Sequence, residues 1–380
     1  MKTDSVLILT MTGDSHTRSV EWLLNKRGIP TYLWFNSDFP KCATGSVHIE
    51  KNELNVLLNS SEGSFKSDGD VIFWYRRSTE PNFSEGLHPS DLPVAIRETA
   101  GFFESLYSSI DHLARFSVNP MSGMIQARSK SLQLKFAVES GLRIPTTLIS
   151  NSPDEIEQFY LRNDKSIIIK SFSSPSWASS SRSYYAYTTK VSGDVIRNRS
   201  SLSASPEIYQ ALIQKKYEVR AFFMGRTYVA VNLESQNLSR SMTDWRAAGT
   251  ANLQARSVKL PDHVVNGCLE FMNKIGIVTG SFDFAVTPDD EYVFFEVNEQ
   301  GQFLWIEECC PELPVLQMFC DFLVSKNPDF VWNDRRNENE TFAEFKASGR
   351  WEEKIQIEAT NHVMVERRPY TEKEELKIPA

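Results

Sequence analysis

The strongest constraint in this sequence is a segment, residues 280–298, that is both aromatic and acidic. Residues 280–286 and 291–298 are rich in aromatic and β-branched side chains, which favour strands. The turn sequence Thr287-Pro288-Asp289-Asp290 lies between them. The pattern predicts a β-hairpin.

The expected register of this hairpin pairs Val286 with Glu291, so that Asp283 lies opposite Phe294. Because side chains alternate between the two faces of a strand, one face then carries three oxygen-bearing side chains, those of Asp283, Glu296 and Asn298. Two carboxylates and an amide, completed by water and substrate phosphates, are ligands that Mg²⁺ accepts together with a nucleotide. The alternative is a hairpin with a solvated acidic face.

Composition limits the class of protein. A chain of 380 residues with 41% hydrophobic composition is long enough for two or three domains. The net charge of −8 provides no overall basic field for a nucleic-acid backbone, so we expect no nucleic-acid partner, although a local basic groove is compatible with it. No apolar run approaches the roughly 20 residues that span a bilayer. We expect no membrane association and a cytoplasmic location.

The five cysteines are an odd number and show no Cys-x-x-Cys spacing. No histidine lies near a cysteine at ligand spacing. We therefore expect reduced thiols, with neither a disulfide framework nor a zinc site.

The first 120 residues alternate strand and helix signals, with strands expected at 6–9 and 31–35 and a helix at 17–26, which is typical of an open parallel sheet. The loop Gly13-Asp14-Ser15 is a weak phosphate-site signal, and an ordinary helix cap is the favoured interpretation. A strand at 71–75 delivers Arg76 and Arg77 to a strand end, where ligands commonly bind, although a surface role is equally compatible.

Further along the chain, a strand at 166–170 ends on Lys170 and is followed by a serine-rich run, residues 171–183. We interpret this run as a mobile flap over a ligand, with a plain surface loop as the alternative. Other strands are expected at 208–213 and 217–224, and the predicted helices are 95–114, 130–140, 261–275 and 314–325. The charged stretch 333–380 is expected to be an appendage, a solvated tail rather than a partner-binding arm, with a short strand at 364–365.

Two lysines in separate elements, Lys130 and Lys170, together with the acidic hairpin, form a charge pattern suited to a triphosphate. Lysine acts as a point charge for phosphate oxygens, while Mg²⁺ bridges them. Either lysine alone would be interpreted as a solvated surface residue.

Arg220 and Arg246 are candidates for binding the acid that such a site would activate. Arginine can hold the oxygens of an acyl phosphate with planar, bidentate geometry. The alternative is a structural ion pair with Glu218 or Asp244.

Nine segments together resemble the ATP-grasp superfamily, and more narrowly its peptide maturases of the microviridin type, the graspetide synthetases. They are Phe73 to Arg77, Lys130 with Gln133-Leu134, residues 141–149, Ile167 to Lys170, residues 210–213, Glu218-Val219-Arg220, Asp244-Trp245-Arg246, Asp283, and residues 296–307. The match covers roughly residues 6–325. The resemblance implies an α/β (α+β) chain with an ATP-grasp fold and an N-terminal Rossmann-like pre-ATP-grasp domain.

The domains expected from this resemblance are a pre-ATP-grasp α/β domain at 1–120, a central subdomain with the flap at 121–205, a C-terminal subdomain with the Mg²⁺ site at 206–330, and the charged extension at 331–380. The implied ligands are ATP and Mg²⁺. Lys130 and Lys170 would contact the phosphates, and the backbone of Gln210, Ala211, Leu212 and Ile213 would meet the adenine. Asp283, Glu296 and Asn298 would carry Mg²⁺, and Arg220 and Arg246 would face the acceptor carboxylate.

The family activates an Asp or Glu side chain of a ribosomal precursor peptide as an acyl phosphate, which a Ser, Thr or Lys side chain attacks to form a macrocyclic ester or amide. Water must be excluded, because an acyl phosphate hydrolyses, and the flap fits that need. The resemblance implies a precursor peptide with a leader as partner, and a homodimer. The alternatives are an ATP-grasp ligase for a small carboxylic acid and an amine, and a non-catalytic nucleotide- or peptide-binding protein.

Overall fold

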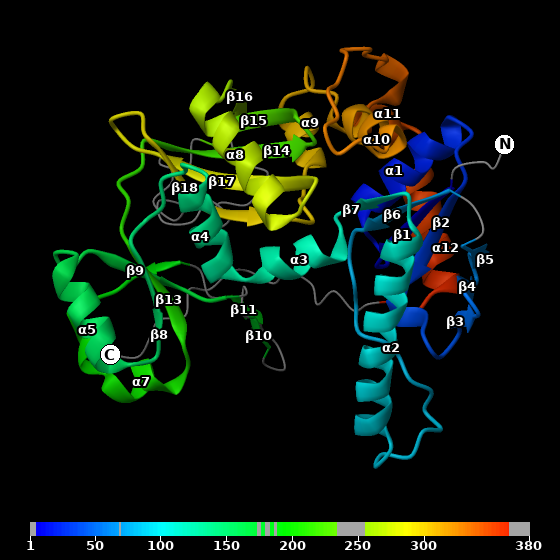
Figure 1. Ribbon diagram of the computed structural model, residues 1–380, viewed down its shortest axis with the longest axis horizontal. Coiled ribbons are helices and arrows are strands. Elements are labelled where there is room, and N and C mark those ends of the chain that lie inside the picture. The colour runs from blue at the N-terminus through cyan, green and yellow to red at the C-terminus, as the bar shows by residue number, and fades with distance from the viewer. Residues whose placement is uncertain are drawn as a thin grey trace.

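The computed structural model describes residues 5–67, 70–172, 176–178, 183–185, 188–233 and 255–364. Figure 1 shows a mainly parallel sheet near the N-terminus at one end, a small antiparallel sheet at the other, and a larger antiparallel sheet between them. Most of the expected flap and the Asp244-Trp245-Arg246 element lie outside the described residues. Among the helices described, none has the length and apolar character needed to cross a bilayer.

The N-terminal sheet is parallel, with strand order β2-β1-β6-β7, and its side chains alternate between two cores. Val6 and Ile8 face one core, while Leu7 and Leu9 face the other. The expected strands at 31–35 and 71–75 are confirmed. The elements are β1 (Ser5–Thr10), α1 (Ser15–Lys26), β2 (Thr31–Phe35), η1 (Asn36–Asp38), β6 (Val71–Tyr75), α2 (Leu92–Leu113) and β7 (Phe116–Val118).

A second, antiparallel sheet, which the sequence analysis did not anticipate, packs beside α2. Its strands are β3 (Thr44–Glu50), β4 (Glu53–Ser60) and β5 (Gly63–Lys66). Val56 and Leu58 of β4 are fully buried in the core that also holds Leu7 and Leu9. This small sheet therefore covers one side of the parallel sheet.

The central sheet is antiparallel, with order β12-β9-β13-β8, and buries Tyr209 of β13 against Ile156 and Phe159 of α5. Ser152 caps α5, its hydroxyl accepting from the Glu155 N–H. The elements are α3 (Met121–Arg128), α4 (Lys130–Glu139), β8 (Thr147–Ser150), α5 (Pro153–Arg162), β9 (Ile167–Lys170), β12 (Thr189–Lys190), α6 (Gly193–Arg197), α7 (Arg199–Ala204) and β13 (Glu207–Ala211), with a two-stranded pair of β10 (Ser176–Ala178) and β11 (Ser183–Tyr185).

The C-terminal sheet is antiparallel, with order β16-β15-β14-β17-β18. One face packs its aromatic residues against α8, and the other contributes Phe222 to the core shared with the N-terminal sheet. The helix α8 ends at Gly276, whose φ of 80° is the left-handed conformation that glycine accepts readily. The elements are β14 (Tyr217–Met224), β15 (Thr227–Leu233), β16 (Ala255–Ser257), α8 (Asp262–Ile275), β17 (Thr279–Val286), β18 (Tyr292–Asn298), α9 (Leu304–Cys309) and α10 (Val315–Ser325).

The C-terminal extension corrects one expectation, because its described part is folded and is not a solvated tail. It forms η5 (Glu338–Glu340), α11 (Phe342–Ala347) and α12 (Arg350–Asn361). Figure 1 shows α12 lying alongside the N-terminal sheet. Met364 is not in a strand, and residue 365 lies outside the described residues.

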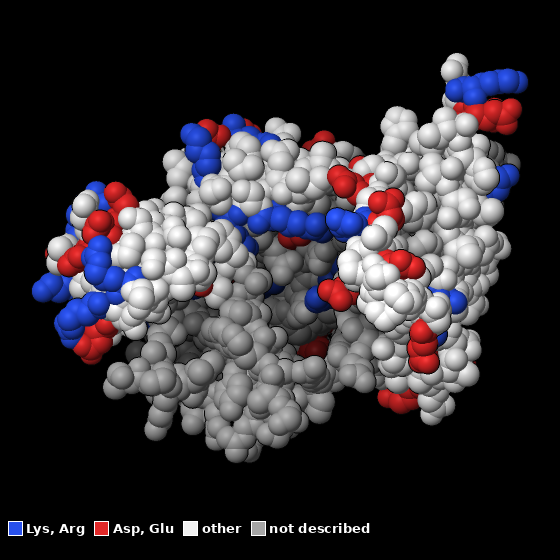
Figure 2. All heavy atoms as spheres, turned by 90° about the horizontal axis from the view of Figure 1, so that it is seen from below, with Lys and Arg blue, Asp and Glu red and all other residues white. Residues whose placement is uncertain are grey.

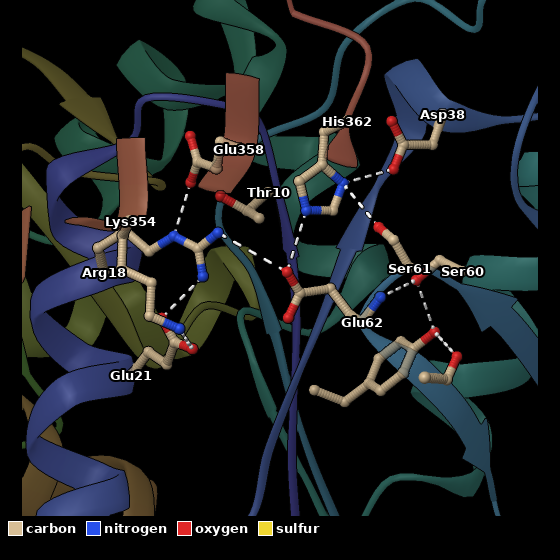
Figure 3. Close-up of polar contacts among 12 residues, drawn as sticks. Thr10, Arg18, Glu21, Asp38, Ser60, Ser61, Glu62, Lys354, Glu358 and His362 are labelled. Atoms are coloured by element: carbon tan, nitrogen blue, oxygen red, sulfur yellow. Dashed lines mark hydrogen bonds and ion pairs between the residues drawn. The ribbon is translucent and has the colours of Figure 1, made fainter. Parts of the chain in front are cut away.

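A buried polar cluster, drawn in Figure 3, attaches α12 to the N-terminal domain. Arg18 of α1, with 1% side-chain exposure, lies 2.6 Å from Glu358 and 2.8 Å from Glu21. The second oxygen of Glu358 accepts a hydrogen bond from the Gly13 N–H at 2.6 Å. A buried carboxylate thus bridges the β1–α1 loop and the helix, because each buried charge needs a partner.

At the end of α12, His362 lies between two carboxylates. Its Nδ1 is 2.7 Å from Asp38 and its Nε2 is 3.0 Å from Glu62. Burial alone would lower the pKa of His362, but the hydrogen bonds to these two carboxylates outweigh it and raise the pKa to about 9. The imidazole is therefore protonated at neutral pH.

We expect the stabilisation from His362 to depend on pH. Because its folded-state pKa lies above the ordinary value of 6.5, the stabilisation is complete below about pH 6.5 and is lost as the pH rises through about 9. Urea unfolding at pH 6, 7.5 and 9 should show the difference between wild type and His362→Gln falling by roughly 1–3 kcal/mol over this range. The exposed His88→Gln is the matched control, and a difference that does not change with pH would contradict the assignment.

Candidate active site

The acidic hairpin forms as expected, but its register differs. Val286 pairs with Tyr292 rather than Glu291, and a bulge between Asp283 and Phe284 places Asp283 opposite Glu296 rather than Phe294. The predicted register was therefore wrong for two reasons: the connection between the paired residues is one residue longer than expected, and the bulge inserts one further residue on β18.

The three expected side chains nevertheless share one face. Glu296 lies directly across from Asp283, and Asn298, two residues further on β18, pairs with Ser281. The bulge brings the two carboxylates closer together than the expected register would.

Arg220 continues this row on β14, where it pairs with Asp283. Its Nη1 lies 2.5 Å from both carboxylate oxygens of Asp283, and its side chain is 8% exposed. The acid beside it in the sequence, Glu218, instead has Lys215 at 2.5 Å. Arg220 is therefore in an ion pair, with the proposed metal ligand itself as its partner.

Lys130 completes the row from the other side. Its Nζ lies 2.7 Å from Glu296, and both side chains are about a quarter exposed. Across three strands and one helix, two cations flank two adjacent anions, so the four formal charges cancel. We call this set, Lys130, Glu296, Asp283 and Arg220, the charge row.

Asn298 behaves differently from the two carboxylates. Its Oδ1 accepts hydrogen bonds from the N–H groups of Gln300 and Gly301, at 3.1 and 3.0 Å. Gly301 has a φ of 47°, and a Cβ there would lie 3.0 Å from the Ser281 hydroxyl, so the tight turn needs glycine. The described residues contain no cluster of three His, Cys, Asp or Glu side chains that could hold a metal.

Lys170 ends β9 opposite Ile208 of β13, so it belongs to the central sheet and not to the hairpin sheet. Gln210 of β13 is buried, and its amide donates to the Thr147 hydroxyl at 3.0 Å. The N–H groups of Ala211 and Leu212 donate to the carbonyls of Thr146 and Ser166, at 3.0 and 2.9 Å. These two N–H groups are engaged within the chain, whereas the Ile213 N–H makes no such bond to any described residue.

The edge strand β18 is held by side chains that the sequence analysis did not assign to the site. Gln133 of α4 accepts from the Val297 N–H and donates to the Val297 carbonyl, both at 3.0 Å. The resemblance included Gln133 but gave it no role. Its amide pairs with the strand as a neighbouring strand would.

Asn119, at the end of the N-terminal domain, holds the open end of the hairpin, where β17 begins and β18 ends. Its Oδ1 accepts from the N–H groups of Val278 and Thr279, and its amide donates to the carbonyls of Thr279 and Glu299, all within 3.0 Å. The sequence interpretation treated this residue only as part of a boundary. The single available signal was its position directly before Pro120.

The loop after β18 is also fixed from the N-terminal domain. Arg76 donates to the carbonyls of Gln300 and Gly301, both at 2.8 Å. His16 Nε2 accepts from the N–H groups of Phe303 and Leu304, at 2.9 and 3.2 Å. Burial lowers the pKa of His16 to about 3, which Arg76 reinforces, so the ring is neutral and can accept.

Figure 2 shows the molecule hollowed between its two ends, with Lys and Arg atoms in a line across the middle of this face. A basic lining of this kind would attract phosphate or carboxylate groups. Arg246, the second arginine expected at the site, lies outside the described residues.

Comparison with known proteins identifies the class. No protein-family model matches the sequence, and no curated protein matches it either. Solved structures do match. An ATP-grasp ligase associated with RiPPs from Chryseobacterium gregarium, in complex with ADP and a leader and core peptide, has a TM-score of 0.79 and 26% identity over 86% of this chain and 98% of its own.

Two macrocyclases from Microcystis aeruginosa MRC are also similar. MdnC, bound with precursor peptide MdnA, has a TM-score of 0.74 and 25% identity over 85% of this chain and 100% of its own. MdnB has a TM-score of 0.70 and 26% identity over 85% of this chain and 99% of its own. The chain therefore has the fold of an ATP-grasp ligase, as the sequence predicted. Within that class it resembles the graspetide-type peptide maturases.

We expect Asn119→Ala to destabilise the protein by roughly 2–4 kcal/mol, because it removes four hydrogen bonds and leaves buried backbone groups without partners. Urea unfolding measures the effect. The exposed Asn266→Ala on α8 should change the free energy of unfolding by less than about 0.5 kcal/mol. Equal effects of the two substitutions would show that Asn119 does not hold the hairpin.

Proposed function

We propose that this protein is an ATP-dependent ligase that matures a ribosomal precursor peptide. It would activate Asp or Glu side chains as acyl phosphates and form macrocyclic esters or amides with Ser, Thr or Lys side chains. The observation that carries the proposal is the charge row on an ATP-grasp sheet, in a chain that matches two macrocyclases, one of them bound with its precursor peptide, over nearly their whole length. The ADP and peptides bound by those relatives support ATP and a leader-bearing peptide as the ligands.

The residues present fit Mg²⁺ bound together with a nucleotide. Asp283 and Glu296 offer two adjacent hard-oxygen ligands, which is as many as Mg²⁺ usually takes when phosphates and water supply the rest. Asn298 would join them if its Oδ1 left the turn amides. When bound, Mg²⁺ neutralises the phosphate oxygens.

The cations of the charge row have matching roles. Lys130 is 2.7 Å from Glu296, so a phosphate near that carboxylate lies within reach of its ammonium group. Lys170 approaches from the central sheet, and the Ile213 N–H is the backbone donor that remains for the adenine.

Arg220, buried and fixed by Asp283, would hold an oxygen of the acyl phosphate with its geometry already set. Arg246 is the second arginine proposed for the acceptor carboxylate. The four domain ranges, the homodimer and the cytoplasmic location inferred from the sequence belong to the same proposal.

The test is the intact mass of a short peptide, encoded beside this gene, after incubation with the protein, ATP and Mg²⁺. We expect the loss of one water for each new link. An unchanged mass with ADP and phosphate released would instead favour a ligase for a small acid. An unchanged mass and unchanged ATP, with a peptide shown to be competent, would favour a binding protein.

We expect Glu296→Gln to reduce product formation at least 100-fold and to weaken Mn²⁺ binding in the presence of ADP at least tenfold, because the amide carries no charge for the metal or for Lys130. Electron paramagnetic resonance of Mn²⁺ measures the binding directly. The matched control is Glu270→Gln, on the exposed side of α8. Unchanged Mn²⁺ affinity in Glu296→Gln would refute the metal assignment.

A further inference from the structure

The carboxyl edge of the N-terminal sheet has the topology of a ligand site. In the order β2-β1-β6-β7, the chain leaves β1 through α1 to reach β2 on one side, and β6 lies on the other side of β1. In open parallel sheets, ligands bind in the crevice where strand order changes direction in this way. Asp14 follows β1 at this point, and Arg76 and Arg77 follow β6.

The charges at this edge do not cancel. Asp14 is buried and lies 3.2 Å from Arg76 and 3.4 Å from Arg77. Burial would raise the pKa of Asp14, but the Arg76 and Arg77 guanidinium groups and the hydrogen bond from the Thr17 N–H contribute to a combined lowering that outweighs it, so that pKa lies below its usual range and the carboxylate is ionised. One carboxylate therefore neutralises only one of the two guanidinium groups, and these three side chains carry a net positive charge.

Arg76 and Arg77 differ in how much of the guanidinium remains accessible to a ligand. Arg76 has 1% side-chain exposure, and its Nη1 is taken by the two loop carbonyls, so its role is structural. Arg77 has 32% side-chain exposure, and Asp14 fixes it through Nε. Arg77 is thus a positioned and accessible guanidinium that carries the excess charge.

A second accessible guanidinium lies on the same border. Arg128, at the end of α3 and 51% exposed, lies over the Tyr75 ring at 5.8 Å and 3.7 Å from Glu299. Tyr75 is two residues before Arg77, and Glu299 directly follows Asn298. Arg128 therefore borders the loop that leaves the proposed metal site, and Arg76, the neighbour of Arg77 in the chain, donates to two carbonyls of the same loop.

We propose that Arg77, with Arg128 at the rim, forms a carboxylate subsite that binds an acidic side chain of the peptide substrate and positions the peptide across the site. This inference rests on the proposed function. A peptide that supplies several Asp or Glu side chains offers one for activation and others for binding. A guanidinium matches a carboxylate in planar geometry. The side chain held here is not the one activated, because the phosphate-binding cations lie in the charge row.

The test uses two fluorescein-labelled ten-residue peptides, one of alternating Thr and Glu and one of alternating Thr and Gln, with the full chain at low salt. Fluorescence anisotropy should show the Glu peptide binding wild type at least fivefold more tightly than the Gln peptide. Arg77→Gln should remove this preference, Arg77→Lys should retain part of it, and Arg128→Gln should lower it two- to threefold.

The matched control is Arg226→Gln, a 56% exposed arginine near the β14–β15 turn, which should keep the preference. ADP affinity should be unchanged in Arg77→Gln. The proposal is overturned if wild type shows no preference, if Arg77→Gln keeps it, if Arg226→Gln loses it equally, or if Arg77→Gln loses ADP affinity, since the anion would then be a phosphate. The mass assay on wild type tests the proposed function separately: a lost preference in Arg77→Gln without crosslinking by wild type would leave the subsite standing and refute the maturase.

Discussion

The need of buried backbone groups for hydrogen-bond partners governs the arrangement of this protein. Residues 297–304 leave the hairpin along an edge where, within the described part of the chain, no further strand pairs with them. Four side chains take the place of that strand: Gln133, Asn119, Arg76 and His16. They come from four separate segments of the N-terminal and central parts of the chain, so the same bonds that satisfy the loop also fix the sheets relative to one another. These hydrogen bonds between the sheets therefore set the position of the charge row.

Sequence patterns predicted the elements whose residues are buried on both faces. The strands at 31–35, 71–75 and 217–224 were found at their expected bounds, because a run of β-branched and aromatic residues has few other stable conformations. The sheet of β3, β4 and β5 was missed, since its first strand is mostly exposed and its pattern is correspondingly weak. The hairpin register was missed because the connection is one residue longer than expected, and because a bulge, which depends on packing and not on local preference, shifts the pairing once more.

For the site, the sequence indicated which side chains have the chemistry to bind a metal ion or a phosphate. The structure shows which of these side chains contact one another. Asp283 and Glu296 were recognisable as carboxylates on one face of a hairpin, but their pairing with Arg220 and Lys130 depends on contacts across 63 and 166 residues. Asn119 and His16 were not recognisable as support for the loop, since their partners are backbone groups with no sequence signature. The charged C-terminal extension concealed its buried members, Phe345 and Glu358, among many solvated neighbours.

The ion pair of Arg18 with Glu358 spans 340 residues, which matters for how the chain acquires its structure during synthesis. A ribosome completes α1 long before α12 emerges, and until then Arg18 lacks the carboxylate that it has at 2.6 Å in the finished fold. Glu21 at 2.8 Å then remains a partner, and a guanidinium that lacks one of its hydrogen-bonding carboxylates resists transfer into an apolar interior. The N-terminal domain is thus synthesised first but completes its folding among the last. A nascent chain that stops short of α12 exposes an incomplete N-terminal domain to chaperones and proteases.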